Sequence, residues 1–279
     1  MSEPIYYVNG KYVPASQAAL TLNDLGIVRG YGVFDLLRTY DGKPFKLHEH
    51  VLRLQRSAEQ IKLVLPWTAA EIEQIALETY ARNAMADATI RIVATGGASE
   101  DFMTPPAQPT LVVMINPIGP TAPEQYTKGV KVVTTQIARM MPTVKSLNYI
   151  TAIMAMQAAR EVGAVEAIYR TTDNRLTEGT RANFFVFQGN RLITPKSDVL
   201  GGITREVVIE IAEDDFEVIE APLYYADLAA YDEAFITSST KEVLPVVQID
   251  DITIGQGRPG PNTQKLIDLF NTYVNRTVK

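Results

Sequence analysis

The stretch from Met140 to Ala152, MMPTVKSLNYITA, places one lysine, Lys145, between two regular patterns. Pro142 interrupts the strand pattern VKVVTTQIA that precedes it, and a helical pattern begins near Thr151. A side chain at such a junction can face a ligand. Apolar neighbours penalise the charged form of a lysine, which makes its amine a better nucleophile. Lys145 is therefore a candidate Schiff-base lysine, and the alternative is an ordinary solvated lysine.

Three polar motifs follow Lys145 and could hold an anionic or aromatic ligand. In LTEGTRANFF, Glu178 precedes a small polar turn and an apolar strand, where a buried carboxylate could pair with a ring nitrogen. In VLGGITREVVIE, two glycines open a helix whose N–H groups can bind a phosphate. FITSSTKE ends a strand with hydroxyl and N–H donors. Each motif alone is equally typical of an exposed loop or turn.

The order of elements predicts two domains. Turns at Asn9-Gly10 and Asp41-Gly42 join strands into hairpins, and apolar residues recur at helical spacing over 47–61. A second helix over 69–83 and the strands ATIRIVAT and PTLVVMI complete this part. Three prolines and a glycine lie between residues 117 and 123. We expect an α+β (mixed α/β) fold with a small domain at 1–117, a linker at 118–126 and a larger domain at 127–279.

The composition excludes several classes of protein. The 26 basic and 32 acidic residues form no basic block, so neither nucleic acid nor an anionic membrane is an expected partner. No run approaches ~18 apolar residues, and the start MSEPIYYVNG lacks the pattern of a signal peptide, so we expect a cytoplasmic protein. With no cysteine and only two histidines, we expect no metal site and no Ser-His-Asp triad.

Six motifs taken together resemble those of the class IV (fold type IV) pyridoxal 5′-phosphate (PLP) aminotransferases. In chain order they are RGYGVFD, EHVLRL, VKSLNY, LTEGTRANFF, GGITREVV and ITSSTKEVLPV. That family includes D-amino-acid and branched-chain aminotransferases and aminodeoxychorismate lyase. The resemblance implies a small and a large domain with the cofactor between them, and a homodimer.

The resemblance also assigns cofactor-binding roles by position. Lys145 matches the lysine that carries PLP and moves protons, and Glu178 matches the partner of the pyridine nitrogen. Arg53 matches the arginine that binds the phosphate. The other matching positions are Tyr149, Leu200, Ile203, Thr204, Ser238 and Ser239. The apolar stripe expected for the helix of Arg53, formed by Leu47, Val51, Leu54, Ala58 and Ile61, leaves Arg53 to face a ligand or solvent.

The chain departs from the family where the substrate carboxylate binds. The Arg-x-His pair of D-amino-acid transaminases is replaced by Gly96 and Ala98, and the tyrosine that branched-chain enzymes place two residues before the strand arginine is Thr89. A carboxylate needs a cation or several N–H donors. We therefore predict substrate contacts from Arg181 first and Arg29 second, with Arg91 and Tyr31 as further candidates. Arg91 could instead form a structural ion pair, and Arg29 a salt bridge in a dimer interface.

The resemblance implies ping-pong transamination between an amino acid and a 2-oxo acid. VKSLN, LTEG and GITREVVI favour D-amino acids, whereas RGYG, Tyr149 and the missing Arg-x-His pair favour L-branched-chain amino acids. We expect D-amino acids as substrates, with L-branched-chain amino acids as the next hypothesis. Aminodeoxychorismate lyase is a further alternative, as is a PLP-binding protein without turnover, although Lys145 and Glu178 are both present.

Overall fold

The computed structural model describes residues 3–119 and 121–278, which form two compact units. Unit 1 contains residues 3–119, the short segment Val144–Asn148 and Val278. Unit 2 contains residues 121–143 and 149–277. Pro120, which belongs to the predicted linker, lies outside the described residues. The segment that carries Lys145 thus packs with the N-terminal residues, although it is distant from them in sequence.

Unit 1 is built on a six-stranded sheet in the order β2-β1-β6-β5-β3-β4. Its neighbouring strands are antiparallel. The hairpins at Asn9-Gly10 and Asp41-Gly42 form as predicted, with positive φ at all four turn residues. The strands are β1 (Ile5–Val8), β2 (Lys11–Pro14), β3 (Gly32–Tyr40), β4 (Lys43–Pro44), β5 (Ala88–Thr95) and β6 (Thr110–Pro117).

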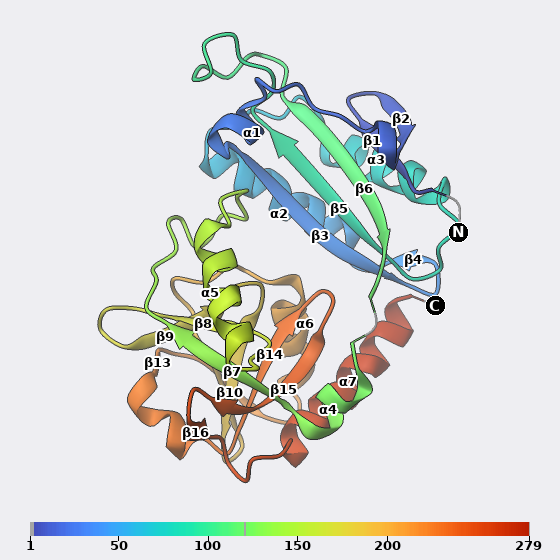
Figure 1. Cartoon of the computed structure of the whole chain (residues 1–279). Helices are drawn as coiled ribbons and strands as arrows, with labels where there is room; N and C mark the ends of the chain where they lie inside the picture. The colour runs from blue at the N-terminus through green and yellow to red at the C-terminus, as the bar shows by residue number, and fades with distance from the viewer. Residues whose placement is uncertain (1–2, 120, 279) are drawn as a thin grey trace. The chain divides into compact units, whose positions relative to one another are not determined.

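The helices of unit 1 include α2 (Leu47–Gln60) and α3 (Ala69–Ala81), which cover one face of this sheet (Figure 1). A capping box between Thr68 and Glu71 fixes the start of α3. The short helix α1 (Leu25–Arg29) and the 3-10 turn η1 (Ala15–Gln17) precede β3. The core between α2, α3 and the sheet is mainly aliphatic and includes Val51, Leu54, Ile72, Ile90 and Ile92.

Unit 2 contains a ten-stranded sheet that closes on itself. The path β10-β14-β15-β7-β8-β9 returns to β10 through one antiparallel pair, Asn183 with Glu178. The closure therefore fixes the position of Glu178. The strands are β7 (Val130–Thr135), β8 (Ala167–Arg170), β9 (Arg175–Gly179), β10 (Asn183–Gln188), β11 (Arg191–Thr194), β12 (Glu217–Glu220), β13 (Leu223–Tyr224), β14 (Glu233–Ser238), β15 (Glu242–Ile249) and β16 (Ile252–Thr253).

Helices pack around this closed sheet. The helix α5 (Ile150–Glu161) contacts β7 and β8, while α6 (Ile203–Ala212) and α7 (Pro261–Thr277) contact β14 and each other. A short helix, α4 (Pro123–Lys128), begins within the predicted linker and ends two residues beyond it, and η2 (Tyr225–Ala230) follows β13. Among the described residues, no helix is both long and apolar enough to cross a membrane. The mixed α/β fold is the one expected from the sequence.

Candidate active site

Lys145 lies in unit 1 on an irregular segment that is bonded to β3. Its N–H donates to Oγ of Ser57 on α2 at 3.2 Å, and its carbonyl accepts from the N–H of Phe34 at 2.9 Å. The half-buried side chain places Nζ 4.8 Å from the centre of the Phe34 ring. The segment therefore holds the lysine from both sides of its backbone and sets its amine over an aromatic face.

Gly32 allows this segment to approach β3. The N–H of Leu147 donates to the carbonyl of Gly32 at 3.0 Å. A Cβ at residue 32 would come within 2.7 Å of the Leu147 side chain and 2.6 Å of the Ala94 carbonyl. The glycine of RGYGVFD is thus needed for the close packing that carries Lys145.

Arg53 is buried, which corrects the expectation that it lies off the buried stripe of its helix. Its Nε and Nη2 donate to the two oxygens of Asp35 at 2.8 and 2.7 Å. Nδ1 of His50 lies 2.6 Å from the same carboxylate and must carry the proton, because an ionised carboxylate only accepts. The amphipathic pattern of the helix did not predict this burial, because it identifies apolar residues only. The buried side of α2 also carries His50 and Arg53, whose acid partner, Asp35, lies on β3.

The Asp35–His50–Arg53 cluster has a defined charge state. Burial alone would raise the pKa of Asp35, but Arg53 and His50 outweigh it and hold that pKa well below its usual range. Burial lowers the pKa of His50, and Arg53 and Lys145 lower it further against the opposing effect of Asp35. The carboxylate is therefore ionised and orients the guanidinium group of Arg53.

The substrate candidates of unit 1 differ in what they contact. Arg91 on β5 lies with Cζ 5.0 Å from the centre of the Phe34 ring, the ring that Lys145 also approaches. The hydroxyl of Tyr31 donates to the Ile61 carbonyl at 3.0 Å, and burial raises the pKa of that hydroxyl. Arg29 ends α1, is exposed and donates to the Val28 carbonyl. Of Arg29 and Arg91, Arg91 is thus the one that shares a contact, the Phe34 ring, with Lys145.

The loop that lacks the Arg-x-His pair has a structural role here. A Cβ at Gly96 would come within 2.5 Å of the Tyr31 ring. Ala98 forms a β-bridge with Asp24, and the Leu25 N–H donates to the Gly97 carbonyl. The loop is therefore packed against α1 and presents no cation at these two positions.

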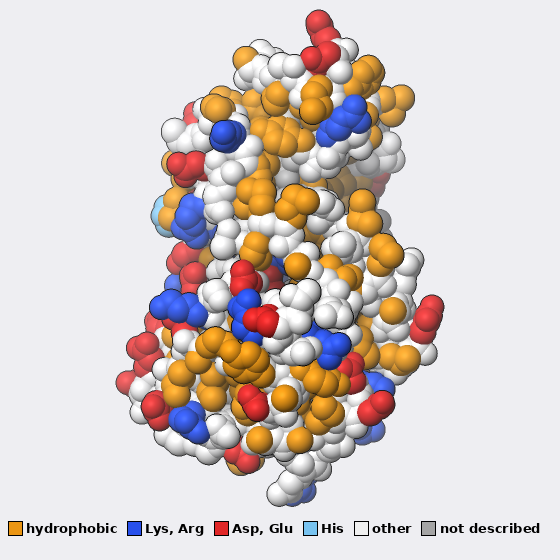
Figure 2. All heavy atoms as spheres, turned by 90° about the vertical axis from the view of Figure 1, so that its left-hand side faces the viewer, with side chains coloured by type: hydrophobic (Ala, Val, Ile, Leu, Met, Phe, Trp, Pro, Cys, Tyr) orange, Lys and Arg blue, Asp and Glu red, His pale blue; other side chains and the backbone are white. Residues whose placement is uncertain are grey.

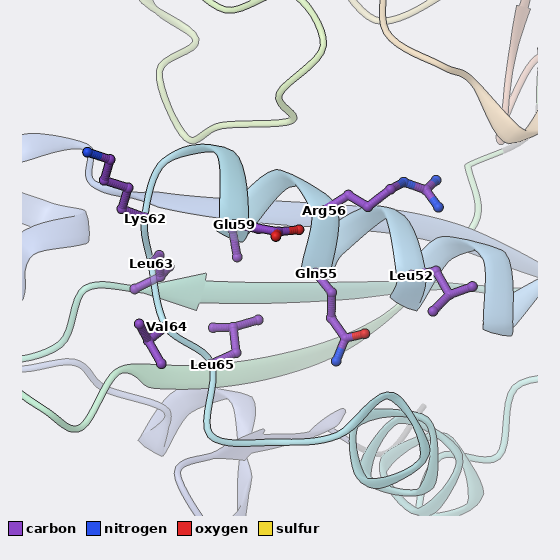
Figure 3. A pocket seen from close by; sticks show the side chains of 9 residues that line it. Leu52, Gln55, Arg56, Glu59, Lys62, Leu63, Val64 and Leu65 are labelled. Carbon is purple, nitrogen blue, oxygen red and sulfur yellow. The ribbon is translucent and has the colours of Figure 1, made fainter.

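A surface groove of about 470 Å³ lies beside the end of α2, and Figure 3 shows the side chains that line it. Arg56, Glu59 and Lys62 contribute charged groups to it. Neither Arg53 nor Lys145 lines this groove. Within unit 1, this groove therefore does not include the two candidate site residues Arg53 and Lys145.

Glu178 is the centre of the candidate residues in unit 2. It is only 3% exposed, and its Oε2 accepts from the Leu200 N–H at 2.9 Å and from Nδ2 of Asn183 at 3.4 Å. Its Oε1 accepts from Nη1 of Arg139. Burial raises the pKa of Tyr169, whose phenol lies close enough to Arg139 and Glu178 to feel both charges. A fixed, paired carboxylate of this kind can accept a hydrogen bond from a protonated ring nitrogen.

Asn183 joins Glu178 to the start of α6. Its Nδ2 also donates to the Leu200 carbonyl at 2.9 Å. Its Oδ1 fills the space beside Gly202, where a Cβ would lie only 2.0 Å away. Gly202 is the N-cap of α6, and the buried residues Ile203 and Thr204 follow it. The predicted ring-nitrogen partner and the predicted phosphate donors are therefore held in one network.

The turn after β14 carries the other predicted donors. Ser238 ends β14, and its Oγ accepts from the Lys241 N–H at 3.2 Å, while Ser239 lies inside the turn. Lys241 of this turn and Arg181 approach the same acid. Nε of Arg181 lies 3.9 Å and Nζ of Lys241 lies 3.1 Å from Oε2 of Glu166. Tyr149 is the N-cap residue of α5.

Several residues around the site were not among the predicted ones. They include Asp35, Arg139, Glu166, Asn183 and Lys241. Asp35 and Asn183 lie inside motifs quoted for other residues, so their chemical type was the available signal. Lys241 also lies inside a quoted motif, ITSSTKEVLPV. Arg139 lies outside the quoted motifs, and nothing in its local pattern separates it from a surface residue.

The comparisons with known proteins identify the family. The model of amino-transferase class IV matches residues 32–249. The chain belongs to this family. The class IV enzymes of fold type IV are PLP-dependent, so the chain is a PLP-dependent aminotransferase, as the six motifs indicated.

Named relatives of this aminotransferase divide between two substrate classes. A Methanocaldococcus jannaschii protein, provisionally named a branched-chain-amino-acid aminotransferase, is 36% identical over 95% of this chain and 94% of its own. A D-alanine aminotransferase of Staphylococcus epidermidis is 32% identical over 96% of this chain and 97% of its own. Both the expected substrate class and its first alternative are thus represented among the relatives.

Solved structures of similar proteins share the fold. A branched-chain amino acid aminotransferase from T.th., solved with pyridoxamine 5′-phosphate, matches 99% of this chain and 96% of its own, with a TM-score of 0.92 and 28% identity. The branched-chain aminotransferase of Thermoproteus uzoniensis with norvaline covers the same shares, with a TM-score of 0.89 and 30% identity. The chain therefore has the fold type IV architecture over nearly its whole length.

Proposed function

We propose that this aminotransferase binds PLP through Lys145 of unit 1 and through Glu178 with the start of α6 in unit 2. The observation that carries the proposal is the network around Glu178, in which a buried carboxylate is fixed by the Leu200 N–H, Asn183 and Arg139. Such a carboxylate is suited to a protonated pyridine nitrogen. Gly202 and the donors after it are suited to a phosphate, since N–H groups at a helix start bind anions.

Each group of the chain has a definite task in this proposal. PLP supplies the electron sink when it is bound. Nζ of Lys145 would take the proton from the substrate Cα as general base and would deliver it to C4′ of the cofactor as general acid. Glu178 holds the proton at the ring nitrogen. Asp35 orients the Arg53 guanidinium, which we assign to the phosphate, with Thr204, Ser238 and Ser239.

We propose D-amino acids as the favoured substrates and L-branched-chain amino acids as the second candidate. The D-alanine aminotransferases among the relatives support the first, and the branched-chain enzymes among the relatives and solved structures support the second. Arg181 is our first assignment for the α-carboxylate. Arg91 is a further candidate because it shares the Phe34 ring with Lys145.

A half-reaction screen tests the proposed function. The PLP-loaded enzyme is mixed with single D- and L-amino acids, and the conversion of cofactor absorbance to the pyridoxamine form is followed. We expect conversion by D-alanine and related D-amino acids at rates at least tenfold above those of the L-enantiomers. Faster conversion by L-leucine, L-isoleucine or L-valine would select the second candidate. No conversion by any amino acid contradicts both.

The same screen tests Arg181. A guanidinium–carboxylate pair is directional, so Arg181→Ala should lower the efficiency with amino acids by roughly one to three orders of magnitude. Amines without a carboxylate should react as they do with the unmodified enzyme. Equal losses for both kinds of substrate would mean that Arg181 supports the fold or the cofactor.

We further propose that the enzyme is a homodimer. Ile150, Ile153 and Met154 are 57–68% exposed on one face of α5, and Met140 nearby in sequence is 80% exposed. Hydrophobic side chains are exposed in several places on the surface shown in Figure 2. Exposed apolar side chains that lie together on one face, as Ile150, Ile153 and Met154 do, are typical of interfaces. Sedimentation equilibrium should give twice the chain mass, and a monomer at all concentrations would refute the dimer.

A further inference from the structure

Three segments of unit 2 converge on one buried acid, Glu166. The residue is fully buried just before β8. Its Oε1 accepts from the Ala167 N–H at 3.1 Å, from the Thr180 N–H at 3.2 Å and from the Thr180 hydroxyl. One oxygen thereby fixes the turn that follows Glu178. The other oxygen, Oε2, is turned to the two cations described above.

The charges around Oε2 do not balance. Nζ of Lys241 lies at 3.1 Å and Nε of Arg181 at 3.9 Å, so two positive charges share one negative charge. Within residues 3–119 and 121–278, neither cation forms an ion pair with any other carboxylate. One positive charge is left over. An anionic group bound by both side chains would complete the balance.

Lys241 is held by a hydrogen bond to Glu166, Arg181 lies within ion-pair distance of the same acid, and both cations are accessible. The Lys241 side chain is 19% exposed and that of Arg181 is 52% exposed, whereas Glu166 is not exposed at all. The backbone of Lys241 is also fixed, because its N–H donates to Oγ of Ser238. Anchoring reduces the side-chain freedom that a lysine or an arginine loses on binding a ligand. The buried acid thus prepares the two cations for an anion.

The position of the pair in the chain indicates which anion it binds. Arg181 follows Glu178 by three residues, and Lys241 follows Ser238 by three. The pair therefore lies on the two turns that carry the assigned partners of the ring and of the phosphate. A phosphate on Lys241 would belong to the cofactor, and a carboxylate to the substrate. The assigned phosphate donors are already provided by Thr204, Ser238, Ser239 and Arg53, which favours the substrate.

We propose that Lys241 is a substrate-binding residue, and that its ammonium group and the Arg181 guanidinium, both anchored on Glu166, bind a carboxylate of the substrate. The proposal deepens the function proposed above and rests on it. It adds a second cation to the assignment of Arg181. It also explains why a lysine in a turn of small hydroxyl residues is held by a fully buried acid.

The test uses Lys241→Met, which removes the charge and keeps the length of the side chain. Lys265→Met is the matched control, because Lys265 also forms a lysine–carboxylate pair in unit 2, with Asp215 at 2.6 Å. Binding of 4-methylvalerate to the PLP-loaded enzyme is measured by calorimetry, with the neutral amide of the same acid as the comparison ligand. This probe carries no amino group, so its binding needs no turnover.

We expect Lys241→Met to weaken 4-methylvalerate binding by about tenfold to hundredfold, the range for charge-assisted hydrogen bonds. Lys241→Arg should stay within about threefold of the unmodified enzyme, because it restores the charge. Lys265→Met should bind like the unmodified enzyme. The amide should bind all variants alike, and the PLP dissociation constant should not change.

Unchanged 4-methylvalerate binding in Lys241→Met would overturn the proposal. So would a tenfold rise in its PLP dissociation constant, since Lys241 would then serve the phosphate. If Lys241→Met does not fold because Glu166 is left without its closest cation, the double variant Glu166→Gln with Lys241→Met removes both charges. That variant must show the same weakened binding. If no amino acid converts the cofactor but the charge-dependent binding persists, the proposed function fails while the carboxylate site stands.

Discussion

Two fully buried acids, Asp35 in unit 1 and Glu166 in unit 2, organise cations in opposite ways. Asp35 accepts hydrogen bonds from Arg53 with both oxygens and a further one from Nδ1 of His50. All three side chains are buried. Glu166 uses one oxygen to fix a turn and holds two partly exposed cations with the other. The first acid completes a closed charge cluster. The second leaves positive charge available to a ligand.

The two arrangements suit different tasks: the Asp35 cluster orients Arg53, and the Glu166 pair can bind a ligand. A closed cluster loses stability when one member is removed, because the partners remain buried with unpaired charge. Removing one cation of an open pair should cost little folding stability, because the exposed cations are solvated when no ligand is bound. It should instead weaken the binding of the ligand. The variants below test whether the two regions respond in these distinct ways.

The largest expected effect follows from Asp35→Asn. The change leaves Arg53 buried without its carboxylate, and breaking a buried pair costs about 3–5 kcal/mol of unfolding free energy. Urea unfolding of the cofactor-free protein measures the loss. Asp173→Asn is the control, because its pair with Arg175 is exposed and should contribute less than about 1 kcal/mol. A loss below about 1 kcal/mol for Asp35→Asn would contradict the closed cluster.

Glu178→Gln should act on the reaction more than on folding. A neutral amide cannot balance a pyridinium charge, so the half-reaction should slow by about a hundredfold to a thousandfold, on the scale of other preorganised charges. Stopped-flow absorbance gives the rate, and equilibrium titration should show that PLP is still bound. Glu217→Gln, at an exposed position of β12, is the control. Near-normal rates in Glu178→Gln would remove it from the catalytic assignment.

Gly202→Ala should weaken cofactor binding with a smaller effect. Its Cβ would lie 2.0 Å from Oδ1 of Asn183, so the side chain that joins Glu178 to α6 must move. Overpacking of this kind costs about 1–3 kcal/mol. Gly201→Ala is a close control, because its Cβ would meet only Oε1 of Glu206 at 3.6 Å. Equal PLP dissociation constants for the two variants would show that Asn183 does not link these elements.

The smallest expected effect is on the pH dependence of stability. Because the pKa of His50 is lowered by burial, the unfolded chain takes up a proton that the folded chain excludes. Stability is therefore complete above the unfolded pKa of about 6.5 and falls as the pH drops below it, by at most about 1.4 kcal/mol per pH unit. Asp35 affects the pH dependence only at lower pH. Because its folded pKa is depressed, the stability that it contributes is present above its unfolded pKa and is lost as the pH falls below it.

Urea unfolding between about pH 7.5 and 5.5, on either side of the ordinary histidine pKa, measures this slope. His50→Gln should flatten it relative to the unmodified protein, while His48→Gln, at an exposed position, should leave it as it is. A slope that survives in His50→Gln would assign the effect to another group.

Local patterns predicted the elements of this fold well where periodicity was strong. The two hairpins and the helices α2, α3 and α5 lie within a few residues of their expected positions. The expected strands of both parts form as well. The strands β9, β11, β12, β13, β15 and β16 were not predicted. All of them except β15 have five residues or fewer, which is too short to show alternation. The closure of the sheet through Asn183 and Glu178 depends on contacts between strands, which single-strand patterns do not encode.

The chemistry of the site was predictable only where a motif carried it. Lys145 and Glu178 could be proposed as site residues because each lies in a recognisable run of residues. The acids that pair with Arg53 and Lys241 come from elsewhere in the chain: Asp35 lies 18 residues before Arg53, and Glu166 lies 75 residues before Lys241. Burial of Arg53 against Asp35 excludes the solvent-facing alternative for this side chain, because a buried ion pair can occupy a position that hydrophobic periodicity predicts to face outward. Its contact with a ligand stays a prediction.

The central claim, that Lys145 carries the cofactor, is tested most directly by borohydride reduction of the PLP-loaded enzyme followed by peptide mapping. Reduction fixes the cofactor to the lysine that holds it. We predict a single pyridoxyl group, on Lys145 in the peptide that contains VKSLNY. A label on Lys241, Lys131 or any other lysine instead of Lys145 would contradict the claim.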